Sequence, residues 1–67
     1  MKSELIKASK LHFQAHIEKH RMNVEVLMRN PTALPGHADI MDAIEKELEE
    51  IANYHDKLEM LNIYFGE

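Results

Sequence analysis

The chain has no cysteine and no tryptophan, and its 67 residues include only two prolines and two glycines. The lack of cysteine excludes disulfides, iron–sulfur clusters and thiolate zinc sites, and it fits a reducing compartment such as the cytoplasm. No apolar run approaches the roughly 18 to 20 residues needed to cross a bilayer. We therefore expect a cytoplasmic protein with no signal peptide and no contact with the membrane.

Motifs for chemistry are also scarce. The sequence has no glycine-rich phosphate loop, and neither Ser3 nor Ser9 has a base at a useful spacing. The net charge is -4, the pI is about 5.7, and the lysines and arginines form no continuous basic stripe. We expect no enzyme activity, no cofactor and no nucleic-acid partner.

What the chain does have is helical periodicity, with 45% apolar and 30% charged residues. Both prolines and one glycine fall between Asn30 and Gly36, which divides the chain almost in half. The sequence predicts one all-α domain over residues 1–67, an antiparallel two-helix hairpin with helices at about 3–30 and 36–65 and a turn at 30–36. Ser3 and either Gly36 or His37 are the expected N-caps, and Gly66 is expected to follow the last residue of the second helix.

Each predicted helix carries an apolar seam at three- and four-residue spacing, as in a coiled coil. Lys10 and His20 interrupt the first seam, and the second begins at His37. The turn places residues whose numbers sum to about 66 side by side, so Phe13 falls near Ile51 and Tyr54. The expected core of the hairpin consists of Ile6, Phe13, Ile17, Val24, Leu27, Met41, Ile44, Leu48, Ile51 and Leu58.

A second, narrower apolar stripe lies opposite the first seam, and apolar residues also fall on the outer face predicted for the second helix. A chain this short has a marginal core, and an isolated hairpin leaves these residues in water. We expect a homodimer, such as a four-helix bundle, or a higher homo-oligomer that acts as a structural or adaptor module. A small regulator that binds a host protein is an alternative. The expected oligomer interface consists of Leu11, Ala15, Met22, Ile40, Tyr54, Leu61 and Tyr64.

Five histidines suggest another alternative, a metal-binding bundle. His12 and His16 are four residues apart, and the register places His55 across from His12, so these three are the candidate ligands. No recognised metal-binding motif is present, and we expect no bound metal. If His20 or His55 is buried and neutral in the seam, its protonation near pH 5 to 6 would lower the stability of the bundle.

Three segments carry a resemblance: His12-Phe13-Gln14-Ala15-His16, the Asn30-Pro31 turn, and the acidic stretch from Asp42 to Leu48. Together they resemble small uncharacterised helical proteins of marine tailed phages. The resemblance implies an accessory protein of the host cytoplasm or of the virion, and it transfers no functional residues.

Overall fold

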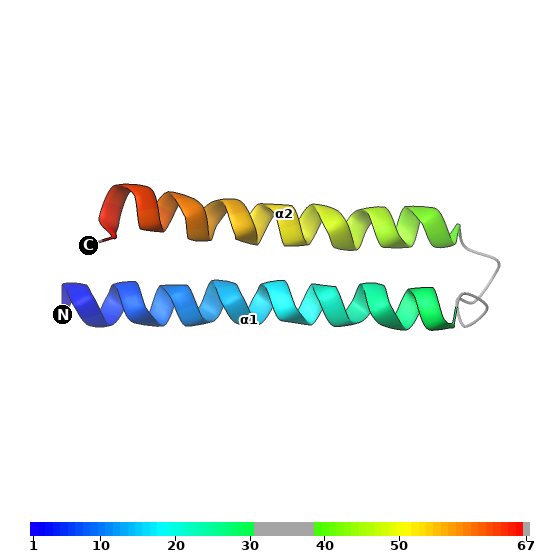
Figure 1. The fold of residues 1–67 in the computed structure, drawn as a ribbon, viewed down its shortest axis with the longest axis horizontal. Helices are drawn as coiled ribbons and strands as arrows, with labels where there is room; N and C mark the ends of the chain where they lie inside the picture. Colours follow the sequence, from blue (N-terminus) through cyan, green and yellow to red (C-terminus); the bar gives the residue numbers. More distant parts are fainter. Residues whose placement is uncertain (31–38, 67) are drawn as a thin grey trace.

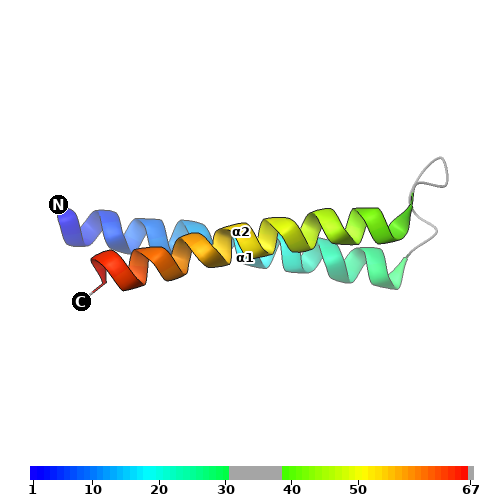
Figure 2. The same cartoon turned by 90° about the horizontal axis from the view of Figure 1, so that it is seen from above.

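The computed structural model describes residues 1–30 and 39–66. Two helices, α1 (Lys2–Arg29) and α2 (Ile40–Phe65), run antiparallel and pack along their whole length (Figure 1). Seen from above, they cross at a shallow angle (Figure 2), as the helices of a coiled coil do. The result is a rod with extents of 48 × 15 × 15 Å. The predicted all-α helical hairpin is confirmed.

The first helix has nearly the predicted bounds. It begins at Lys2, one residue before the expected start, and Met1 caps it without a side-chain hydrogen bond. It ends at Arg29, where the backbone N–H of Asn30 donates to the carbonyl of Val26 over 3.0 Å. The end falls before Pro31 because a proline disfavours helical backbone in the residue that precedes it.

The second helix begins later than predicted, at Ile40 instead of residue 36. The carboxylate of Asp39 accepts hydrogen bonds from the backbone N–H groups of Met41, over 2.9 Å, and Asp42, over 3.4 Å. An aspartate satisfies free N–H groups and complements the positive helix end, which neither Gly36 nor His37 does as well. Gly36, His37 and residues 31–36 of the predicted turn lie outside the described residues.

The far end of α2 lies at Phe65, and Gly66 follows it as expected. The backbone N–H of Gly66 donates to the carbonyl of Asn62 over 3.1 Å. A Cβ atom at residue 66 would lie only 2.3 Å from that carbonyl oxygen. The close approach of backbone to backbone explains why glycine suits this position.

The seam of α1 is the one that its sequence predicts. His20 and Val24 are buried, and the other seam residues are half-buried. Their spacing alternates between four and three residues, so one side of the helix faces α2 throughout. The seam consists of Ile6, Lys10, Phe13, Ile17, His20, Val24 and Leu27.

The structure corrects the predicted seam of α2. Met41 and Leu48, expected in the core, are 70% and 51% exposed. Ile40, Tyr54 and Leu61, expected on the outer face, are half-buried at four-and-three spacing with the rest of the seam. The observed α2 seam consists of Ile40, Ile44, Glu47, Ile51, Tyr54, Leu58 and Leu61.

The correction has a physical reason. Ile44, Ile51 and Leu58 recur every seventh residue and belong equally to two seams, one through Met41 and Leu48 and one through Glu47 and Tyr54. The first seam carries the polar His55 and Asn62 but no charged residue, whereas the second is interrupted only by Glu47, and the prediction followed the first. The seam through Glu47 and Tyr54 is the one that forms, and it brings a polar and an aromatic side chain of α2 against polar and aromatic side chains of α1.

The core of the hairpin is thin. Among the described residues, only Val24 and His20 are buried, at 8% and 9% exposure. One seam between two helices cannot enclose more, because each seam residue has water on at least one flank. In the described part of the chain, neither helix is both long and apolar enough to cross a membrane.

Candidate functional site

A polar cluster lies in the middle of the seam. Nδ1 of His20 on α1 is 2.5 Å from Oε2 of Glu47 on α2. The amide of Asn23, on the next turn of α1, donates to Oε1 of the same carboxylate over 3.0 Å. Glu47 therefore accepts with both oxygens, and its position on the seam is explained by the donors opposite it.

A second carboxylate extends this cluster toward solvent. Oε2 of Glu50 lies 3.9 Å from Nε2 of His20, and the Glu50 side chain is about half exposed, at 48%. Both ring nitrogens of His20 thus have acidic neighbours on α2. The cluster joins the basic helix to the acidic one: residues 1–29 have a net charge of +3, and residues 36–67 a net charge of -7.

Next to the polar cluster, histidines stack against a tyrosine. The rings of His16 and Tyr54 are 4.3 Å apart between centroids, with 11° between their planes. His12 meets His16 edge-on at 4.5 Å, and Phe13 lies 6.3 Å from Tyr54. The register predicted Phe13 and Tyr54 at one level, but Tyr54 faces α1 and not the outside.

The environment of His16 disfavours a positive charge. Removal from water lowers the pKa of its imidazole from 6.5, and the neighbouring His12, Lys19, His20 and Lys57 lower it further. Its Nδ1 atom is shielded from solvent and has no hydrogen-bond partner among the described residues. The neutral ring instead stacks on Tyr54, an aromatic contact that needs no charge.

We expect the hairpin to lose stability as pH falls below about 6.5. The folded-state pKa of His16 lies below its unfolded value of 6.5. The unfolded chain therefore binds the proton more readily, so the contribution of His16 is fully present above that pH and is lost below it. Thermal melts at about pH 7.5 and about pH 5.5, on either side of an ordinary histidine pKa, should show the lower melting temperature at acid pH.

The variant His16→Asn should reduce this pH dependence. The exposed His55→Asn is the matched control for removal of an imidazole. If His16→Asn and the parent chain lose the same number of degrees between the two pH values, His16 does not carry the effect.

The structure does not bring the three candidate metal ligands together. His12 and His16 are adjacent on α1, but His55 is exposed on α2 because Tyr54 occupies the seam position beside it. Within residues 1–30 and 39–66, no three His, Cys, Asp or Glu side chains are grouped as a metal ion would require. The burial proposed for His55 in the sequence-based pH hypothesis is likewise absent.

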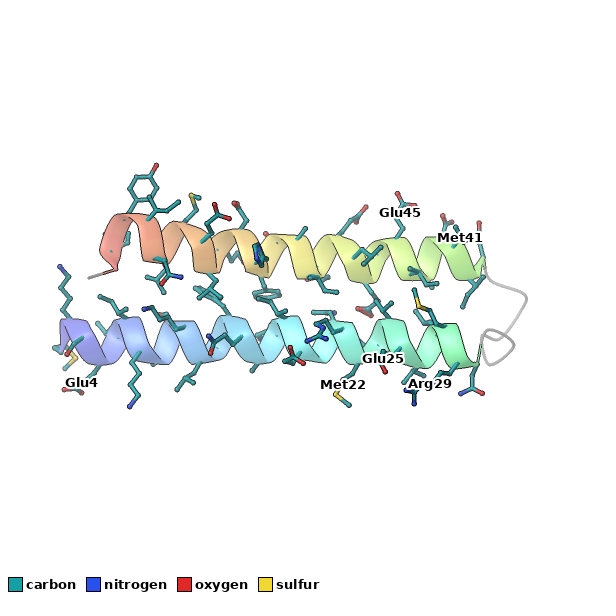
Figure 3. The ribbon with its side chains drawn as sticks, in the orientation of Figure 1. Glu4, Met22, Glu25, Arg29, Met41 and Glu45 are labelled. Atoms are coloured by element: carbon teal, nitrogen blue, oxygen red, sulfur yellow. The ribbon has the colours of Figure 1, made fainter. Side chains whose placement is uncertain are left out.

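The second feature of interest is the outer stripe, a row of apolar residues on the side of α1 that faces away from α2. Its large members are well exposed: Leu11 at 58%, Met22 at 67% and Val26 at 57%. Figure 3 shows Met22 pointing away from the partner helix. Two small residues in the same row leave its surface open to close approach. The outer stripe consists of Ala8, Leu11, Ala15, Met22 and Val26.

No family model, curated protein or solved structure matches this chain. The features that bear on function are therefore the polar cluster and the outer stripe. In the polar cluster, Glu47 satisfies donors of the same hairpin. The large residues of the outer stripe, by contrast, are more than half exposed to solvent.

Of the predicted interface residues, four are exposed and three are not. Leu11, Ala15, Met22 and Tyr64 are exposed, whereas Ile40, Tyr54 and Leu61 lie in the seam of the hairpin. Sequence reasoning missed Glu47 as a seam residue, and it missed Asn23 and His16 as residues that contact α2 from beside the α1 seam. The four- and three-residue spacing of Ile40, Ile44, Glu47 and Ile51 could have revealed the α2 seam. A search for apolar residues alone does not follow that spacing past Glu47.

Proposed function

We propose that this protein is a non-catalytic structural or adaptor module that self-associates through the outer stripe of α1. The observation that carries the proposal is the exposure of Leu11, Met22 and Val26 on one side of a well-formed helix. A row of large exposed apolar residues along one side of a helix indicates an interaction site. A second copy of the chain offers a surface of the same shape and chemistry.

The size of the core supports the same proposal. A domain of about 60 residues buries only about 60% of its unfolded surface and is correspondingly marginal. This hairpin has two buried residues among those described, Val24 and His20. Burial of the outer stripe against a second copy would add apolar contact area that one hairpin cannot provide.

The remaining surface favours α1 over α2 as the docking helix. The side of α2 that faces away from α1 carries exposed carboxylates, among them Asp42, Glu45 and Glu49. Glu45 points outward in Figure 3. These carboxylates of two copies would repel each other, whereas the outer stripe of α1 presents the exposed apolar side chains of Leu11, Met22 and Val26.

Met22→Glu is expected to convert the assembly to monomers. A carboxylate at the centre of an apolar contact loses water without gaining a partner, which costs several kcal/mol in the assembled state. Sedimentation equilibrium over a range of concentrations measures the change. The matched control is Met41→Glu, which makes the same substitution on α2 at nearly the same exposure, 70% against 67%.

The two variants decide between the helices. The proposal predicts that Met22→Glu sediments as a single hairpin and that Met41→Glu associates like the parent. A parent chain that is itself a 7.8 kDa monomer at high concentration overturns the proposal. Equal association of Met22→Glu and the parent overturns the assignment to α1.

A further inference from the structure

The two apolar surfaces of α1 lie on opposite sides of the helix. At 100° per residue, the centre of the outer stripe is about 180° from the centre of the seam. In a closed four-helix bundle the two contact directions of each helix are closer to a right angle. The position of the stripe instead places a second copy on the far side of α1, so that the two α1 helices lie between the two α2 helices.

The ends of the outer stripe carry opposite charges. Glu4 precedes Ala8 by one helical turn and Arg29 follows Val26 by nearly one turn, so both lie in line with the stripe. Both side chains are exposed, at 81% and 78%. Lys7 and Glu25, also exposed, lie on one flank of the stripe near its two ends.

These charges distinguish the two ways of pairing α1 with a copy of itself. In a parallel pair in register, Glu4 meets Glu4 and Arg29 meets Arg29, so like charges face each other at both ends of the stripe. In an antiparallel pair, the stripe overlaps itself fully when paired residue numbers sum to 33 or 34. Glu4 then lies opposite Arg29 of the second copy. Lys7 lies close to Glu25 of the second copy, offset along the axis by no more than two residues.

The apolar residues fit the antiparallel register too. Leu11 falls opposite Met22 of the second copy, and the small Ala8 falls opposite the larger Val26. The two-fold axis repeats every contact, so each favourable pair occurs twice. The helix dipoles, which oppose each other in an antiparallel pair, favour the same arrangement.

We propose that two copies of this chain dock antiparallel through the outer stripes of α1, with Glu4 of each copy opposite Arg29 of the other. The inference rests on the proposed function and specifies its geometry. Within one hairpin, Glu4 lies 3.7 Å from the terminal amino group and Arg29 lies 3.2 Å from Glu25. These local pairs are highly exposed and therefore weak, so both side chains are available to a second copy.

Charge reversal tests the pairing. Glu4→Arg and Arg29→Glu should each weaken the dimer about tenfold, because each places like charges opposite one another at two symmetric positions. The double variant Glu4→Arg/Arg29→Glu restores opposite charges and should return to within about threefold of the parent. The matched control for Glu4→Arg is Glu45→Arg on α2, which changes the charge by the same amount and should leave the dissociation constant unchanged.

A distance measurement tests the direction independently of the charges. The chain has no cysteine, so Ser3→Cys carries a single spin label near the start of α1. In the antiparallel register, residue 3 of one copy is about 27 residues along the axis from residue 3 of the other, or about 40 Å. A parallel pair brings the two labels within about 20 Å.

The outcomes separate this inference from the proposed function. A label distance near 40 Å together with rescue by the double variant supports antiparallel docking. A dimer that Met22→Glu dissociates, but whose labels lie within about 20 Å, overturns the direction and keeps self-association. Failure of the double variant to recover overturns the pairing of Glu4 with Arg29. A monomeric parent chain overturns both proposals.

Discussion

Tyr54→Ala is expected to lower the free energy of unfolding of the hairpin by about 2 to 3 kcal/mol, below the range for a fully buried aromatic side chain. The substitution removes the ring that stacks on His16 at 4.3 Å and that lies beside Phe13. It also removes the cation–π contact with Nζ of Lys57, 4.8 Å from the ring centroid. For a core this thin, the loss is a large part of the total stability.

The control for this prediction is the other tyrosine of the chain. Tyr64 lies on the same helix but is 70% exposed, so Tyr64→Ala should cost no more than about 0.5 kcal/mol. Urea titration followed by circular dichroism, at one protein concentration, measures both. Equal losses for the two variants would mean that Tyr54 does not pack in the seam. Leu48→Ala, at 51% exposure, should behave like Tyr64→Ala.

Glu47→Ala is expected to cost about 2 kcal/mol, because it leaves the donors opposite it without their acceptor. Because His20 is only 9% exposed, water cannot readily replace the acceptor that it loses. Asn23 loses the acceptor of its amide at the same time. The cost therefore exceeds that of an ordinary surface hydrogen bond and of an exposed ion pair.

Two further variants separate the hydrogen bonds from the charge. Glu47→Gln keeps an acceptor oxygen for one donor and should lose about half as much free energy as Glu47→Ala. Glu45→Ala removes an equal charge from an exposed position of α2 and should change stability by less than about 0.5 kcal/mol. If Glu45→Ala destabilised the hairpin as much as Glu47→Ala, the effect would come from net charge and not from the cluster.

The polar cluster also limits how α2 can slide along α1. A slip of one heptad keeps the apolar seams in contact but places Ile40 or Tyr54 opposite His20 instead of Glu47. The imidazole then has no acceptor on α2, which costs about 1 to 3 kcal/mol for a buried group. A polar residue in an otherwise apolar seam selects one register in this way at some cost in stability.

Much of the hairpin followed from local chemistry. The helix period, the break at Pro31 and the charge difference between the halves predicted two antiparallel helices. The α1 seam was predictable in full because only one stripe of that helix carries large apolar residues at both the three- and four-residue steps. The outer stripe was also predictable, because Leu11, Met22 and Val26 recur on the opposite side of the helix.

The seam of α2 was not predictable, because its sequence allows two choices. Ile44, Ile51 and Leu58 fit a seam through Leu48 as well as a seam through Glu47, and the rule that a charged residue avoids the core favours Leu48. The choice depends on groups of the other helix, which lie 24 to 38 residues away in sequence. Sequence alone therefore determined the two helices and the α1 surfaces. Only the tertiary structure decided which side of α2 is inside, because hydrogen bonding of Glu47 and stacking of Tyr54 require their partners on α1.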